Sequence, residues 1–350
     1  MQKLNHYLFS VGLVLIAMNG IGKTANVAGY ICLLASLYLI LRKKVTNFGP
    51  WWMWTCFIII VPIAVILNTG VTSIGMAVLA PVVYLTALNT DRKVLSWAFG
   101  VASIVASLSI MIYFFNGRYG GTGGLVDTIN YNLGIAVVLL GALLGPKTWR
   151  WALLSLAIPS VLLSGAEEGL FALAIIGVVC IIRKDIGMKI MPIIFMVTIC
   201  AVSLLVFHQP ESLYNRINLQ LTSLNDDVGI SGRWSVYAQS LRDIHVWGHV
   251  YDPVRMYFGD NPQDMAHTTI HNIPLLVLYQ LGPIAFVAWL VMVFGTLWKT
   301  SEKYLIVGLF ALSTFDHFLW TQLWFWTPAI LGVAHQSSIK DWIWRKQCVG

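Results

Sequence analysis

Long apolar runs alternate with short polar segments along most of this chain. The runs predict twelve helices, at about residues 5–21, 27–41, 51–67, 74–88, 94–115, 131–145, 151–164, 169–182, 190–207, 271–298, 303–315 and 322–338. A helix needs about 20 apolar residues to cross a bilayer, so the shorter runs predict broken helices or shifted boundaries. A reentrant pair at 151–182 is an alternative. Prolines at 62, 81, 159 and 328 fall inside runs, where proline bends a helix. The pattern predicts an all-α polytopic membrane protein.

One long polar segment, residues 208–270, interrupts this pattern and is expected to hold two short helices. Within "RWSVYAQSLRDI", Trp234, Ala238 and Leu241 recur at helical spacing, so this face is expected to lie on the apolar bundle. Ser231 precedes that helix as its expected N-cap. The predicted organisation is nine N-terminal helices in 1–207, a loop in 208–270, three C-terminal helices in 271–338 and a tail in 339–350.

Composition and charge support a membrane location and exclude a nucleic-acid partner. The chain is 58% hydrophobic and 11% charged, whereas a soluble domain carries roughly 25% charged residues. When successive polar segments are assigned to alternate sides, 16 of the 22 Lys and Arg fall on the side of the N-terminus. Cytoplasmic segments carry this excess, so both termini are expected in the cytoplasm and the long loop on the outer side of the membrane. The net charge of +7 is then mostly an anchoring signal.

Arginine is scarce on the predicted outer side, so its few outer positions are candidates for binding. Arg118 lies in "NGRYGGTGGLVD", Arg216 in "YNRINLQ" and Arg233 in "SGRWS". The guanidinium group offers a planar fork of donors that matches phosphate oxygens. A solvated loop charge is the alternative for each of them. The "GGTGG" stretch is not a phosphate loop, because no Gly-Lys-Ser/Thr follows it.

Two short outer turns carry ionisable residues close to the predicted bilayer. Glu167 and Glu168 lie in "SGAEEGLF", and Asp316 and His317 lie in "STFDHFLWTQ". Ionisable groups near bilayer depth are costly, so they are functional candidates by default. An ordinary surface turn is the alternative.

The stretch "HTTIHNIPLLVLYQLGP" places His267 and His271 four residues apart, a spacing that puts both rings on one face of a helix and is often found in metal sites. Pro274 argues against a continuous helix, because proline belongs in a first turn. Asn272 is then the N-cap, and His271 lies at the start of a helix that begins near Ile273. We expect no metal there. His271 is a candidate general base, with a structural role as the alternative, because imidazole titrates near neutral pH.

Three outer segments together resemble the C-terminal part of the O-antigen ligase and polymerase superfamily. They are "SGRWSVYAQSLRDIHVWGHV", "HTTIHNIPLLVLYQLGPIAFVAWL" and "FDHFLWTQLWFWTPAILG". In that family an Arg opens a periplasmic helix, a downstream His-Asn begins a membrane helix ending in Leu-Gly, and an Asp-His-type turn sometimes follows. The stretch "GRYGGTGG...INYNLG" is similar to an upstream family motif. The resemblance covers about residues 116–335 and implies a GT-C-like helical architecture.

The resemblance implies transfer of a glycan from undecaprenyl diphosphate to an acceptor on the periplasmic face, without a cofactor or metal. His271 would act as general base. Arg233, with Arg118 or Arg216, would hold the departing diphosphate. Asn272, Glu167, Glu168, Asp316 and His317 are further candidates for substrate contact. The implied partners are the lipid-linked oligosaccharide, an acceptor glycan or lipid A-core, membrane lipids and a chain-length regulator.

One departure from the family pattern separates the possible activities. Many ligases have Ser-Arg-Gly where this chain reads "LLSGAEEGLF", so the arginine is missing. This favours a polymerase of surface polysaccharide over a ligase that attaches glycan to lipid A-core. A transporter or flippase for lipid-linked glycans is the alternative from another class. Its ionisable residues are expected near the midplane, whereas here they cluster at outer helix ends.

Overall fold

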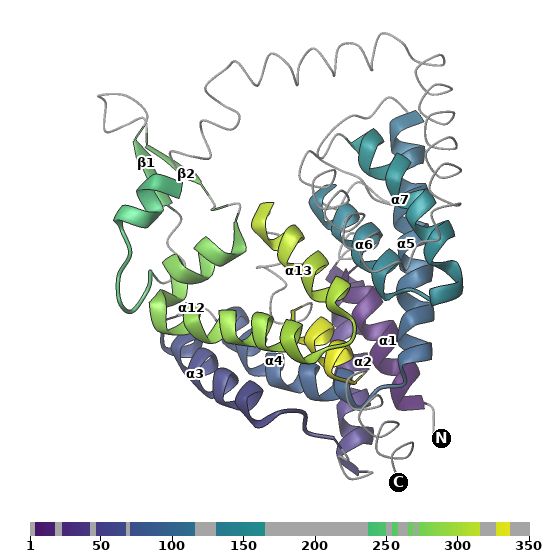
Figure 1. The fold of residues 1–350 in the computed structure, drawn as a ribbon, viewed down its shortest axis with the longest axis horizontal. Helices are drawn as coiled ribbons and strands as arrows, with labels where there is room; N and C mark the ends of the chain where they lie inside the picture. Colours follow the sequence, from purple (N-terminus) through teal and green to yellow (C-terminus); the bar gives the residue numbers. More distant parts are fainter. Residues whose placement is uncertain are drawn as a thin grey trace.

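Helices make up nearly all of the regular structure in the computed structural model of this chain (Figure 1). The structure describes residues 4–17, 23–42, 47–67, 71–115, 131–164, 237–249, 254–257, 265–268, 270, 272–315 and 327–336. Its helices are α1 (Leu4–Ala17), α2 (Lys23–Arg42), α3 (Trp51–Leu67), α4 (Val71–Leu88), α5 (Arg92–Phe115), α6 (Tyr131–Leu144), α7 (Arg150–Ser164), α12 (Ile273–Lys299) and α13 (Lys303–Phe315), with a 3-10 turn η2 (Lys147–Trp149). Residues 237–242 and 327–336 are also helical.

The predicted helical class is confirmed for the described residues. Ten of the twelve predicted runs coincide with helices, and the runs at 169–182 and 190–207 lie outside the described residues. The described residues of the long polar loop include one helical stretch and a hairpin that the sequence did not predict, while the rest of the loop lies outside the described residues. The helical stretch is residues 237–242, and the hairpin consists of two antiparallel strands, β1 (Val254–Tyr257) and β2 (Met265–Thr268).

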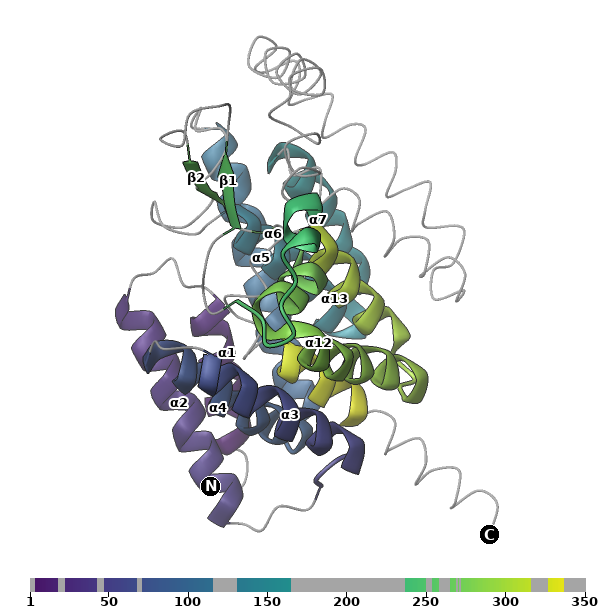
Figure 2. The ribbon, with the colours of Figure 1, turned by 90° about the vertical axis from the view of Figure 1, so that its left-hand side faces the viewer.

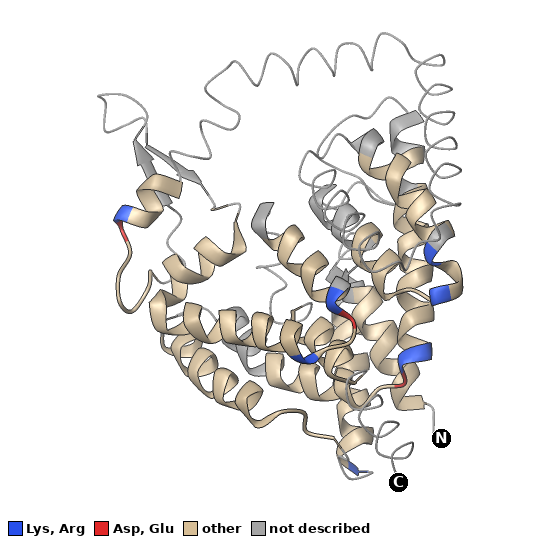
Figure 3. Cartoon of the chain, in the orientation of Figure 1, with Lys and Arg blue, Asp and Glu red and all other residues tan. Residues whose placement is uncertain are grey.

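Side-chain bonds hold together the helix ends that carry most of the described basic residues. This basic end comprises the ends of α2, α6 and α12 and the starts of α1, α5, α7 and α13 (Figure 3). The backbone N–H of Asp91 donates to His6 Nδ1 at 3.0 Å, which joins the starts of α5 and α1. Ser96 Oγ donates to the carbonyl oxygen of Leu144, which joins α5 to the end of α6. These two bonds join the start of α5 to the start of α1 and to the end of α6.

A buried ion pair lies at the centre of the basic end. Arg92, at the start of α5, pairs with Glu302, which precedes α13 and is 5% exposed. Thr300 accepts a hydrogen bond from the Glu302 N–H and donates its hydroxyl proton to the carbonyl oxygen of Ala334, at 3.0 Å each. The pair therefore ties α5 to the α12–α13 turn and to helix 327–336.

The outer faces of the helices are apolar along their length. On α2 the exposed large residues are Val27, Ile31, Leu34, Tyr38 and Leu41, and on α12 they are Ile284, Val287, Val291, Phe294 and Trp298. Both sets recur at alternating steps of three and four residues, so each forms one continuous stripe. The opposite faces are buried, as where α12 packs along α3 (Figure 2). Helices that are apolar all round are typical of membrane spans. Among the described residues, α12 is the one helix that is long and apolar enough to cross a bilayer.

Replacing Glu302 with Gln tests the buried ion pair. The variant is expected to unfold at a lower temperature in mild detergent, because it leaves the Arg92 charge without its partner. The cost is on the order of 1–3 kcal/mol, since Arg92 is itself 24% exposed. Lys303→Gln, at an exposed neighbouring position, is the control and is expected to keep the wild-type midpoint. Equal midpoints for both variants would show that the pair contributes nothing.

Candidate functional site

Asn272 is the sequence-predicted site residue whose position the structure describes. The others, Arg118, Arg216, Arg233, Glu167, Glu168, His271, Asp316 and His317, lie outside the described residues. The part of the candidate site that the structure describes is therefore the start of α12 together with the segment 237–249, which packs against α12.

Asn272 caps α12 as predicted. Its backbone is extended, with φ −158° and ψ 108°, and its side-chain oxygen accepts the Leu275 N–H at 2.9 Å. Pro274 lies in the first turn, where its missing N–H costs no helical bond. Ile270 and Ile273 are 1% and 0% exposed and anchor the chain on both sides of the cap. The start of α12, directly after position 271, is thus fixed by both polar and apolar contacts.

The interpretation of His267 and His271 as a metal pair on one helix is excluded. His267 lies in β2, where its Cα pairs with that of Arg255 across the hairpin, and β2 ends before α12 begins. His267 therefore lies on a strand and not on a helix. In the described ranges, no group of three His, Cys, Asp or Glu side chains lies close enough to hold a metal ion.

α12 is broken after its first nine or so residues. Gly282 has φ 79° and ψ 172°, a conformation outside the helical region that an L side chain rarely adopts. Pro283 follows it and has no N–H to donate. The helix predicted at 271–298 is therefore present as α12, with a kink at Gly282.

The loop segment replaces the hydrogen bond that the break removes. In a continuous helix, the carbonyl of Tyr279 would accept the N–H of residue 283, which is proline here. Instead the backbone N–H of His249 donates to Tyr279 O at 2.9 Å. An unpaired buried carbonyl is costly, so this bond both stabilises the break and holds the loop on α12.

Two glycines allow this close backbone contact. A Cβ on Gly248, whose φ is +74°, would lie 2.1 Å from the Gln280 carbonyl oxygen. A Cβ on Gly282 would lie 2.4 Å from the Val246 carbonyl oxygen. Both distances are far inside van der Waals contact, so any larger residue at either position would push the loop away from the helix.

Two histidines that the sequence did not single out lie at this contact. The rings of His245 and His249 meet edge to face, with centroids 4.5 Å apart, and His249 stacks on Tyr279 at 4.4 Å. His249 Nε2 donates to the carbonyl oxygen of Asp243, which leaves Nδ1 on the other side of the ring. The contact places two imidazoles beside the first two turns of α12, within roughly 10 Å of Asn272 along the helix.

The helical residues 237–242 present a different face to the bundle than the sequence predicted. Ala238 and Leu241 are exposed, Leu241 at 54%. Tyr237 packs against the main core, and Ser240 is fully buried. Trp234 and Ser231 lie outside the described residues. The prediction assumed that the apolar residues of this helix face the core, whereas Tyr237 and Ser240 make that contact.

Gly248→Ala tests whether the glycine contact holds the loop on α12. The added methyl group would collide with the Gln280 carbonyl, so the His249 amide is expected to exchange its hydrogen faster by about ten-fold. Trp247→Ala is the control, because that side chain is 66% exposed and the backbone is unchanged. Hydrogen exchange measured by mass spectrometry gives the readout. If the His249 amide remains protected in Gly248→Ala, the glycine contact does not hold the segment.

The chain matches no known protein-family model and no curated protein. Three features of the described residues bear on function. These are the broken helix α12, the loop segment docked on it and the apolar stripes on the outer faces of the bundle.

Proposed function

We propose that this protein is a membrane glycosyltransferase that moves a glycan from undecaprenyl diphosphate to an acceptor on the periplasmic face of the bacterial inner membrane. The observation that supports it most is the docking of the polar loop on the broken start of α12, where the His249 N–H meets Tyr279 O. This contact fixes polar residues over an apolar bundle, at the helix start that follows His271. Twelve membrane helices in a GT-C-like arrangement are part of the proposal.

Tryptophan positions and the outer apolar faces support the membrane placement. Trp51 begins α3 and is 78% exposed, and Trp298 lies near the end of α12 and is 82% exposed. Both therefore lie toward the basic end, as expected for an aromatic belt at the cytoplasmic interface. Trp52 and Trp54 instead pack against the core. The exposed stripes on α2 and α12 would face lipid between the two interfaces.

The proposed reaction is a displacement at the anomeric carbon of the lipid-linked sugar. The acceptor hydroxyl oxygen forms the new bond to that carbon and gives its proton to neutral His271. The bond between the anomeric carbon and the diphosphate oxygen breaks, and undecaprenyl diphosphate leaves with the electron pair. Arg233, with Arg118 or Arg216, stabilises the developing negative charge, so the step requires no metal in principle. Asn272, Glu167, Glu168, Asp316 and His317 are proposed to contact the sugars.

Polymerisation of surface polysaccharide is the favoured form of this reaction, because the Ser-Arg-Gly of many ligases is replaced by "LLSGAEEGLF". A ligase acting on lipid A-core remains the closest alternative. The break in α12 is the observation that favours a transporter, since transporters often bind substrate at discontinuous helices. Here the carbonyl freed by Pro283 is already occupied by the loop, which favours a structural role for the break.

Complementation with Arg233→Ala and His271→Ala tests the proposed chemistry. Each variant is expected to lower surface glycan by roughly 100-fold or more, the usual cost of removing a general base or a charge-stabilising donor. Arg242→Ala is the matched control, because Arg242 is exposed in the same loop. All variants are compared at equal abundance in the membrane fraction. Normal glycan from both test variants would contradict the proposal.

The glycan that accumulates in a deletion strain separates the three candidate functions. A single repeat on lipid A-core indicates that a polymerase is missing. Long chains left on undecaprenyl diphosphate indicate a missing ligase. Repeats retained on the cytoplasmic face indicate a missing flippase, which would overturn the enzymatic proposal.

A further inference from the structure

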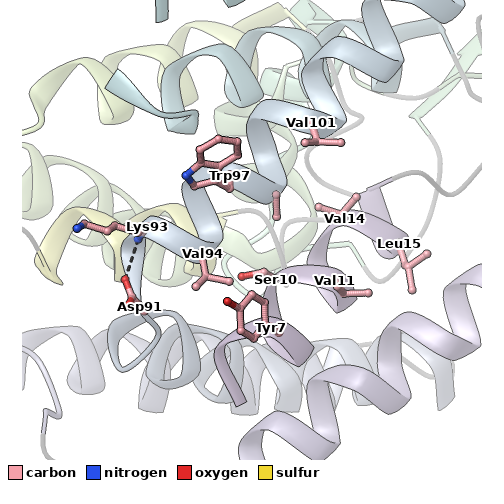
Figure 4. A pocket seen from close by; sticks show the side chains of 11 residues that line it. Tyr7, Ser10, Val11, Val14, Leu15, Asp91, Lys93, Val94, Trp97 and Val101 are labelled. Atoms are coloured by element: carbon pink, nitrogen blue, oxygen red, sulfur yellow. Dashed lines mark hydrogen bonds between the residues drawn. The ribbon is translucent and has the colours of Figure 1, made fainter. Parts of the chain in front are cut away.

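An apolar groove lies between α1 and α5, away from the candidate site (Figure 4). Its volume is about 680 Å³. The lining residues are Tyr7, Ser10, Val11, Val14 and Leu15 on α1, Val94, Trp97, Ala98 and Val101 on α5, and Asp91 and Lys93 at one end. The groove therefore combines a long apolar wall with a single charged end.

From this groove we infer a binding site for one acyl chain of an anionic phospholipid in the leaflet next to the basic end. The inference rests on the proposed membrane placement and not on the glycosyl transfer. Tyr7, Val11 and Trp97 are each about half exposed, at 52%, 47% and 52%, so the groove opens to the outside of the bundle. Water there would find few hydrogen-bond partners, whereas a hydrocarbon chain would bury these side chains.

The length of the groove matches one leaflet. Lys93 and Val101 are eight residues apart on α5, and Tyr7 and Leu15 are eight residues apart on α1, which corresponds to roughly 12 Å of helix in each case. Half of a bilayer's hydrocarbon core is about 15 Å. The hydrogen bond from the Asp91 N–H to His6 Nδ1 joins the start of α5 to the start of α1 at the polar end of the groove. An acyl chain would therefore enter from the polar end and reach almost to the bilayer midplane.

Lys93 gives the groove its preference for an anionic head group. Its neighbour Arg92 is already paired with Glu302, and the Asp91 carboxylate accepts the Lys93 backbone N–H at 2.9 Å as the cap of α5. The Lys93 side chain is exposed, and among the described residues it forms no ion pair. Among the lining residues of the groove, Asp91 is the one acidic side chain. Basic positions between helices on the cytoplasmic side commonly bind lipid head groups.

Native mass spectrometry of the full chain, released from mild detergent, tests the head-group preference. Phosphatidylglycerol and phosphatidylcholine with the same acyl chains are supplied in equal amounts. The wild type is expected to retain about five times more phosphatidylglycerol than phosphatidylcholine, because one lysine near the membrane surface attracts an anionic head group by about this factor. Lys93→Gln is expected to abolish the preference, whereas Lys147→Gln, an exposed lysine at the same end but outside the groove, keeps it. Equal retention by Lys93→Gln and the wild type overturns the proposal.

A photo-crosslinking residue at Val11 tests where the lipid binds. The same residue at Ile31, on the exposed stripe of α2, is the control for general lipid contact. After extensive detergent washing, a phospholipid adduct is expected to persist at Val11 and to be lost at Ile31. An adduct to polyprenyl lipid, to detergent or to protein at Val11, or no difference between the two sites, overturns the proposal.

The lipid and glycan proposals fail separately. Lys93→Gln is expected to support normal surface glycan, because Lys93 has no part in the proposed transfer. A loss of lipid selectivity without a loss of glycan supports the groove site alone. Absence of the chain from the membrane fraction would overturn the placement that both proposals share.

Discussion

One backbone hydrogen bond connects the two parts of this molecule that the proposed function needs. Pro283 removes the helical partner of the Tyr279 carbonyl, and the His249 N–H takes its place. A peptide carbonyl left unpaired in an apolar setting is costly, so the broken helix and the loop depend on each other. The loop gains a fixed position from the break, and the break is tolerable because the loop is there. Rearranging either element exposes polar backbone groups of the other.

At the basic end, side-chain hydrogen bonds hold neighbouring helices and turns together. Thr300 Oγ1 reaches the Ala334 carbonyl, and Gln336 Nε2 donates to the carbonyl of Thr90, so helix 327–336 is bound to two neighbouring turns. Tyr84, fully buried, bonds to His335 Nδ1 at 2.9 Å, and Trp52 meets the same imidazole edge to face. An apolar helix face can pack equally well against another helix or against lipid. Hydrogen bonds between side chains and backbone therefore specify which helices become neighbours.

The sequence predicted what depends on local pattern and missed what depends on distant contacts. Apolar runs located the helices because burial and lipid contact both require apolar residues over a helix's length. Asn272 could be predicted as the N-cap because Pro274 permits few other positions for the start of the helix. The break at Gly282 was overlooked in the single run at 271–298, since hydropathy is insensitive to a positive φ. Gly248 and His249 could not be identified as its partners, because their role appears only when the loop meets α12.

Close helix packing explains how the bundle remains rigid enough to hold such a loop. Helices that are apolar on every face gain little from hydrophobic burial against each other in lipid, so van der Waals contact must provide much of their affinity. Small residues allow it: a Cβ on Gly332 would lie 2.7 Å from the Ala87 Cβ, and one on Gly141 would lie 2.7 Å from the Phe99 carbonyl oxygen. These contacts bring helix backbones together on the inner faces, while the larger side chains remain on the outer stripes. The same sequence thereby separates a tight interior, which holds α12 and its docked loop, from an apolar outer surface with a groove between α1 and α5.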